Sequence, residues 1–126
     1  MVTGGDLYVG GYFTAAGGTA VNSIAKWNSS GWSALGSGFN DRVNALAVRG
    51  SDLYAGGDFT TADGMSANYI AKWDGSTWSA MGMGMNGSVF ALAVSGSDLY
   101  VGGNFTMAGG MSANYIAKWG GAVGAC

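Results

Sequence analysis

The chain has 126 residues, a length that allows one compact domain, and 48% of them are hydrophobic, which argues against a disordered chain. Charged residues make up only 10% and the net charge is −2, without a basic cluster, so neither nucleic acid nor an anionic membrane surface is expected as a partner. No apolar run approaches the roughly 18–20 residues that a transmembrane helix needs, and the first residues do not resemble a signal peptide, so we expect a soluble chain without a membrane partner.

One segment recurs three times along the chain. Leu7, Leu53 and Leu99 lie 46 residues apart (53 − 7 and 99 − 53), and the Lys-Trp pair that begins at Lys26 recurs at the same interval without a gap. A period of this size is typical of solenoids, propellers and arrays, in which one unit cannot bury its apolar face alone. We therefore treat residues 1–126 as a single repeat domain with units 1–48, 49–94 and 95–126.

Each unit is expected to contain short strands joined by tight turns. The first unit begins with the last residues of an apolar strand, and a Gly/Ser/Asp cluster then predicts a hairpin turn at 3–6, 49–52 and 95–98. An apolar strand that ends in a Gly-Gly pair follows at 7–11, 53–57 and 99–103. A loop of small residues leads to a third strand, predicted over 23–27, 69–73 and 115–119.

The remaining two strands differ in polarity. An outer strand is predicted over 32–35 and 78–81, and residues 120–126 are expected to form a degenerate copy of it. The next run, 43–48 and 89–94, is apolar at nearly every position, as expected for an innermost strand that is covered on both faces. The first unit lacks most of this innermost strand.

Four short strands per unit, with the most apolar strand innermost, predict an all-β fold in the form of a β-propeller with four-stranded antiparallel blades. The chain holds about two and a half to three such blades. A parallel β-helix is the main alternative, but its rungs are usually shorter.

These motifs carry a resemblance to known repeats. Apolar-Tyr-apolar-Gly-Gly, then a strand ending in Trp-Asn or Trp-Asp, then a turn and a second Trp, resembles the kelch-type blade. Leu-Tyr-Val-Gly-Gly-x-Phe-Thr together with Ile-Ala-Lys-Trp is more closely similar to repeats of large bacterial surface and secreted proteins and of the fungal cortical polarity-marker family. The resemblance covers Met1 to Trp119, although Trp27 and Trp32 are closer together than is usual in kelch blades. It implies binding or scaffolding rather than catalysis and an extracellular or cell-surface location, and it identifies no ligand.

The number of blades predicts self-association. Propellers usually close with four to eight blades, so this chain is expected to complete its ring by oligomerisation. A homodimer is favoured, because two chains would form a pseudo-six-bladed ring in which the first blade of each chain packs on the last blade of the other. A trimer, an engineered chain and a piece of a longer chain are the alternatives.

The residue types offer little chemistry. The sequence contains no histidine, the commonest general base and metal ligand, so we predict no catalytic residue, no enzyme activity and no cofactor. Asp58, Asp63 and Asp74 occur only in the middle unit, but they are not spaced as a calcium loop, and no metal site is predicted. Cys126 is the only cysteine, so an intrachain disulfide is excluded.

The predicted function is a non-catalytic scaffold or binding module whose partner is a second copy, with a glycan or a protein as a further ligand. A lectin with one shallow site per blade is the alternative. Tryptophan can fill the space between sheets or stack against sugars. The predicted repeat core consists of Trp27, Trp73, Trp119, Tyr8, Tyr54 and Tyr100, and the candidate ligand-binding residues are Trp32 and Trp78.

Overall fold

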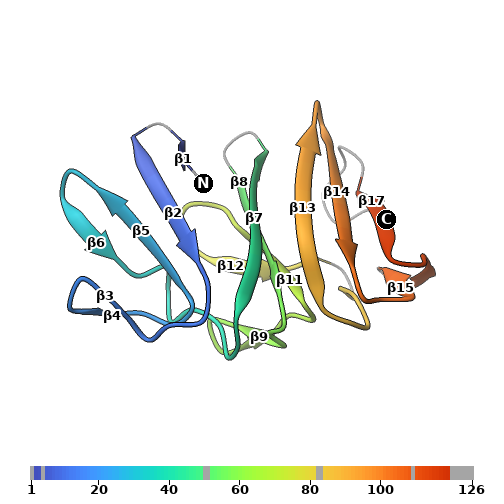
Figure 1. Cartoon of the computed structure of the whole chain (residues 1–126), viewed down its shortest axis with the longest axis horizontal. Coiled ribbons are helices and arrows are strands. Elements are labelled where there is room, and N and C mark those ends of the chain that lie inside the picture. Colours follow the sequence, from blue (N-terminus) through green and yellow to red (C-terminus); the bar gives the residue numbers. More distant parts are fainter. Residues whose placement is uncertain (1, 4, 50–51, 82–83, 109, 120–126) are drawn as a thin grey trace.

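The computed structural model describes residues 2–3, 5–49, 52–81, 84–108 and 110–119, and every regular element in this part of the chain is a β-strand. Three larger sheets stand side by side in chain order along the longest axis of the molecule (Figure 1). The predicted all-β class is confirmed, in the form of several small antiparallel sheets. The described residues include no helix that is long and apolar enough to cross a membrane.

Each of these three sheets is an antiparallel meander. The first sheet contains β1 (Val2–Thr3), β2 (Asp6–Gly10), β5 (Ile24–Asn28) and β6 (Gly31–Ser33). The middle sheet contains β7 (Val43–Arg49), β8 (Asp52–Gly57), β11 (Ile70–Trp73) and β12 (Trp78–Ala80). The third sheet contains β13 (Val89–Ser95), β14 (Asp98–Gly103) and β17 (Ile116–Trp119). The strand predicted over 120–126, with Cys126, lies outside the described residues.

The segments that the sequence analysis assigned to loops contain three small hairpins. They all lie at one end of the larger sheets (Figure 1). Two consecutive residues with positive φ form the turn of the first two hairpins, Gly17-Gly18 and Asp63-Gly64. This conformation is what a two-residue turn of the primed type requires. The strands are β3 (Ala15–Ala16), β4 (Thr19–Ala20), β9 (Thr61–Ala62), β10 (Met65–Ser66), β15 (Met107–Ala108) and β16 (Met111–Ser112).

The third strand of each sheet begins one residue later than predicted. Ser23, Tyr69 and Tyr115 have φ values of 65°, 68° and 69°, which lie in the left-handed region. The extended conformation of each strand therefore starts only at the next residue. In the middle unit the Tyr69 N–H donates to the carbonyl of Phe59 at 2.9 Å and its carbonyl accepts from the Gly57 N–H at 3.0 Å, and the other units repeat both bonds. These hydrogen bonds offset the cost of the unusual backbone conformation.

The three sheets share one pairing register. Leu7 is opposite Trp27 in the first sheet, as Leu53 is opposite Trp73 in the middle sheet. Because side chains alternate between the faces of a strand, equivalent residues of every sheet point in the same direction. The middle sheet therefore contributes to two hydrophobic cores. Trp73, Trp78 and Leu53 pack toward the first sheet, and Tyr54, Ile70 and Ala47 pack toward the third.

Glycine allows the sheets to approach one another closely. A Cβ atom at Gly10 would lie 2.6 Å from Val43 Cγ1, and one at Gly56 would lie 2.3 Å from Val89 Cγ1. The first glycine of each Gly-Gly pair thus leaves room for the valine that begins the innermost strand of the next sheet.

Candidate binding surfaces

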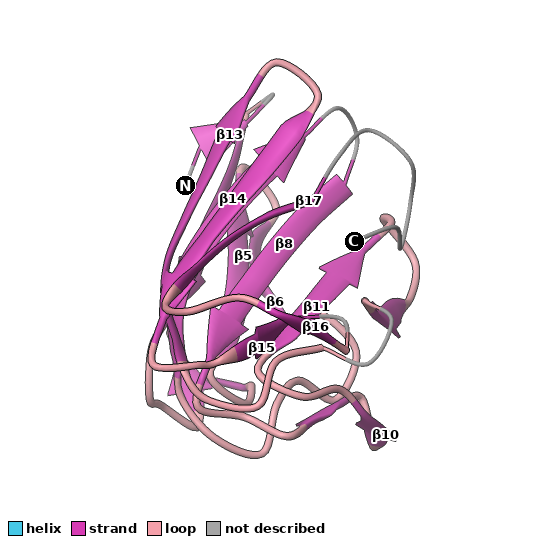
Figure 2. Cartoon of the chain, turned by 90° about the vertical axis from the view of Figure 1, so that its right-hand side faces the viewer, coloured by secondary structure: helices cyan, strands magenta, loops and turns pink. Residues whose placement is uncertain are grey.

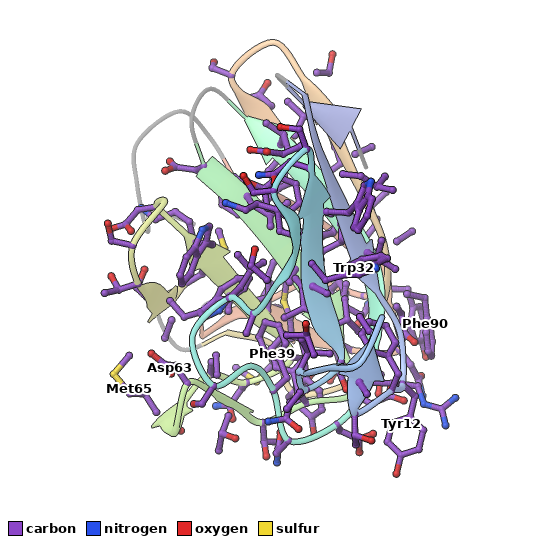
Figure 3. All side chains as sticks on the ribbon, turned by 90° about the vertical axis from the view of Figure 1, so that its left-hand side faces the viewer. Tyr12, Trp32, Phe39, Asp63, Met65 and Phe90 are labelled. Carbon is purple, nitrogen blue, oxygen red and sulfur yellow. The ribbon has the colours of Figure 1, made fainter. Side chains whose placement is uncertain are left out.

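Within the described part of the structure, no sheet covers the outer face of the first sheet or that of the third sheet. Figure 2 looks onto the third sheet, and Figure 3 looks onto the first sheet, where Trp32 is labelled. The residues that β-strand alternation places on these faces define two surfaces. The tryptophan face, on the first sheet, consists of Leu7, Val9, Ala25, Trp27 and Trp32, and the tyrosine face, on the third sheet, consists of Ala91, Ala93, Tyr100, Gly102, Ile116 and Lys118.

The tyrosine face carries residues that are buried in the middle sheet. Tyr54 and Ile70 are both 0% exposed because the third sheet covers them, whereas their equivalents Tyr100 and Ile116 are 37% and 66% exposed. A shallow apolar hollow of about 210 Å³ lies on this face between β13, β14 and the start of β17. A Cβ atom at Gly102 would meet no atom closer than 3.9 Å. The space that a valine fills at Gly10 and Gly56 is therefore open at Gly102.

The tryptophan face shows the same contrast. Trp27 is 44% exposed and Trp32 is half-buried, with their ring centroids 5.1 Å apart. The equivalent Trp73 and Trp78 are 9% and 1% exposed, because the first sheet covers them. Aromatic surface of this kind is usually placed against another apolar surface or a ligand.

The predicted site residues are thus divided between interior and surface. Trp78 is buried, and its indole N–H donates to the carbonyl of Leu35 at 2.9 Å, so its ring is not accessible to a ligand in this structure. Trp32 remains accessible on the tryptophan face, although its ring packs against the hairpin turn at Gly17. The structure does not bring Trp32 and Trp78 together, because they belong to different sheets.

The predicted core residues are also unequally buried. Tyr54 and Trp73 lie in the cores, and Tyr8 is half-buried against the first of them. Burial raises the pKa of the Tyr8 hydroxyl, and the nearby Asp6 carboxylate raises it further. Trp27 and Tyr100 are exposed, because no sheet among the described residues covers their faces. The side chain of Trp119 lies outside the described part of the structure.

The three aspartates of the middle unit serve different local contacts. The Asp58 carboxylate lies 3.5 Å from the Arg42 guanidinium, and Asp63 accepts hydrogen bonds from the N–H and hydroxyl of Ser37 at 2.8 and 2.7 Å. Asp74 accepts from the N–H groups of Ser76 and Thr77 within its own turn. Among the described residues there is no group of three or more potential metal-ligating acids or cysteines.

Hydrogen bonding lowers the pKa of two of these carboxyls. The pKa of Asp63 is lowered mainly by the backbone N–H of Ser37 and then by its hydroxyl. The pKa of Asp74 is lowered mainly by the N–H of Thr77 and then by that of Ser76. Both groups stabilise turns or junctions, and neither lies in a pocket with other acids.

Two asparagines that the sequence analysis did not single out tie the connection between successive sheets to the small hairpin of the following unit. The Asn40 side-chain oxygen accepts hydrogen bonds from the Thr60 and Thr61 N–H groups at 2.9 and 3.1 Å, and its amide donates to the Thr60 hydroxyl at 3.0 Å. Asn86 makes the same three contacts with Thr106 and Met107 at the next junction. Asn40 and Asn86 are separated by one repeat period, and this spacing was the signal in the sequence that could have identified them.

Comparison with protein-family models, with curated protein sequences and with solved structures finds no match for this chain. The two outer faces described above are therefore the main basis for a functional proposal.

Proposed function

We propose that this chain is a non-catalytic scaffold or binding module, in which the three sheets are blades of a β-propeller and a second copy completes the ring. The observation that carries this proposal is that the same repeat positions are buried in the middle sheet and exposed on the two outer sheets. The tyrosine face exposes the equivalents of the residues that the middle sheet buries against the third sheet. The tryptophan face exposes the equivalents of the residues that the middle sheet buries against the first sheet.

The two faces are complementary to each other rather than each to itself. Within the chain, the face that carries Tyr54 and Ile70 packs against the sheet that carries Leu99 and Val101. Head-to-tail packing of this kind closes into a ring only if the rotations between successive sheets add up to one full turn. Two copies would join the tyrosine face of each chain to the tryptophan face of the other and leave no large apolar face uncovered.

The solution mass tests this proposal. Light scattering coupled to size exclusion, in reductant so that Cys126 cannot link chains, should give about 25 kDa, twice the 12.6 kDa of one chain. Ile116→Lys should give the mass of one chain, because it adds a charge at the position whose equivalent in the middle sheet, Ile70, is fully buried. Met65→Lys is the matched control, since Met65 is 51% exposed but lies on the β9–β10 hairpin. A folded single chain for the unmodified protein would contradict the proposal.

The exposed Trp27–Trp32 pair favours carbohydrate binding as a second candidate function, because sugar rings stack on exposed aromatic surfaces. Titration with mono- and oligosaccharides should then quench tryptophan fluorescence, and Trp32→Ala should remove most of the response. An unchanged spectrum over the millimolar range would contradict this alternative.

A further inference from the structure

A hollow of about 350 Å³ lies at the base of the β3–β4 hairpin, beside the connection that leads to the middle sheet. Two of its lining residues, Tyr12 and Phe39, lie toward the end of the molecule where the small hairpins are (Figure 3). Aromatic, hydroxyl-bearing and amide-bearing residues line it, and no charged residue does so in the described part of the chain. The hollow therefore combines apolar surface with uncharged polar groups.

One of the lining residues, Ser23, is buried without a partner for its hydroxyl. Ser23 is only 4% exposed. Its N–H donates to the carbonyl of Phe13 at 2.8 Å and its carbonyl accepts from the N–H of Gly11 at 3.0 Å, but its hydroxyl has no hydrogen-bond partner among the described residues. Because an unpaired buried hydroxyl is costly, such groups in native proteins usually bond to water or to a ligand.

The polar groups around Ser23 are held in place by the chain itself. The Phe39 N–H donates to the carbonyl of Asn22 at 3.1 Å, which fixes the connection next to Ser23. The amide of Asn22 donates to the carbonyl of Ser37 at 2.8 Å, and this bond orients the Asn22 side chain. Its side-chain oxygen has no partner within the described residues, so it is available as an acceptor. The site is therefore pre-organised, which lowers the entropy cost of binding.

The other two units have a tyrosine at the position of Ser23. Tyr69 and Tyr115 have φ values of 68° and 69°, close to the 65° of Ser23, so the same backbone accepts either residue. Tyr69 packs against the second core and lines a hollow of about 340 Å³ together with Met85 and Met107. That second hollow has no equivalent of the buried serine hydroxyl, which makes the hollow at Ser23 specific to the first unit.

We propose that the hollow at Ser23 binds a neutral saccharide, with a sugar ring against its aromatic lining and sugar hydroxyl groups bonded to Ser23 and Asn22. A sugar ring has apolar faces that stack on aromatic rings, and its hydroxyl groups both donate and accept hydrogen bonds. The volume is at the lower end of the range for small-molecule sites, which suits a single sugar ring better than a long chain. The nearby Arg42 guanidinium lies 3.5 Å from the Asp58 carboxylate, so its charge is balanced and does not favour an acidic sugar.

This site differs from the Trp27–Trp32 pair and rests neither on that pair nor on ring closure, because it is formed within one chain. Three variants of the full chain separate the possible contributions. Ser23→Ala removes only the hydroxyl. Ser23→Tyr fills the hollow with the residue that the other two units carry at this position, so the variant should fold. Trp32→Ala changes the tryptophan face and leaves the lining of the hollow unchanged.

Glucose, galactose, mannose and N-acetylglucosamine are the probes, each titrated into the millimolar range while the assigned backbone amide signals are followed by NMR. At least one of these sugars should shift the signals of residues 13, 22–23 and 39–40, in the unmodified chain and in Trp32→Ala alike. Ser23→Ala should weaken binding by about tenfold without lowering the free energy of unfolding, because the hydroxyl has no partner in the sugar-free chain. Ser23→Tyr should abolish the shifts.

Three results would overturn the proposal. They are the absence of shifts with all of these sugars, shifts that persist in Ser23→Tyr, and shifts that disappear in Trp32→Ala. The last result would assign sugar binding to the tryptophan face, and none of the three bears on the solution mass that tests self-association.

Discussion

The Trp27–Trp32 and Trp73–Trp78 pairs have nearly the same local geometry and very different surroundings. Their ring centroids are 5.1 and 5.3 Å apart, and their interplanar angles are 52° and 49°. Trp27 is nevertheless 44% exposed, whereas Trp73 is 9% exposed. The repeat thus determines how the two rings meet across a β-turn, and the neighbouring sheet determines whether they are core or surface.

The difference arises from residues of the preceding sheet and its connection. Phe39 packs edge-on against Trp78 with ring centroids 4.7 Å apart, and the Leu35 carbonyl accepts the indole N–H of Trp78. No described residue covers the Trp27–Trp32 pair from outside in the same way. Stability is best compared between such equivalent positions on the Ile116→Lys background, so that self-association does not contribute.

Truncation of the two equivalent tryptophans should give the largest difference. Trp78→Ala should lower the free energy of unfolding by about 3–5 kcal/mol, because it leaves a cavity in the core and an unpaired carbonyl at Leu35. Trp32→Ala should cost roughly 1 kcal/mol, since that ring is partly solvated. Urea unfolding followed by circular dichroism measures both, and equal costs would show that the tryptophan face is buried in solution.

Addition of one methyl group at equivalent glycines should give the next largest difference. Gly56→Ala should destabilise the chain by about 1–3 kcal/mol, because the new Cβ overlaps with Val89. Gly102→Ala should change stability by less than about 0.5 kcal/mol, because its side is open. The same unfolding measurement applies, and a large cost at Gly102 would indicate that another surface occupies this space.

The equivalent contacts of Asn40 and Asn86 should contribute equally to stability. Asn40→Ala and Asn86→Ala should each cost about 1 kcal/mol, because each removes the acceptor of two backbone N–H groups. Thr60→Ala is the control, since it removes only the hydroxyl contact and should cost less. Unequal effects of Asn40→Ala and Asn86→Ala would show that the two junctions are not energetically equivalent.

Acid sensitivity should be the smallest effect. The pKa values of Asp63 and Asp74 are lowered from 3.8 in the folded chain, so their contribution to stability is present above that value. It is lost as the pH falls through the folded pKa values. Asp63→Asn and Asp74→Asn should each make the loss of stability below pH about 4 less steep. Unfolding midpoints measured between pH 5 and 2 test this, and unchanged slopes in the double variant would contradict it.

Much of the local structure could be predicted from the sequence. The 46-residue period and the apolar runs located all of the larger strands to within a few residues, because these signals depend only on neighbours along the chain. The small hairpins were missed, although Asp63-Gly64 is a recognised two-residue turn signal. The left-handed conformation of Tyr69 could not be predicted, because it is stabilised by hydrogen bonds to Phe59 and Gly57.

The sequence alone determined which residues of each unit share a face, since the alternation of side chains follows from the strand itself. The tertiary structure decided which copy of each face is covered. Ile70 and Ile116 have the same sequence neighbours on both sides, yet one is 0% and the other 66% exposed. Burial depends on the adjacent sheet, and only the stacking order of the three sheets specifies that neighbour.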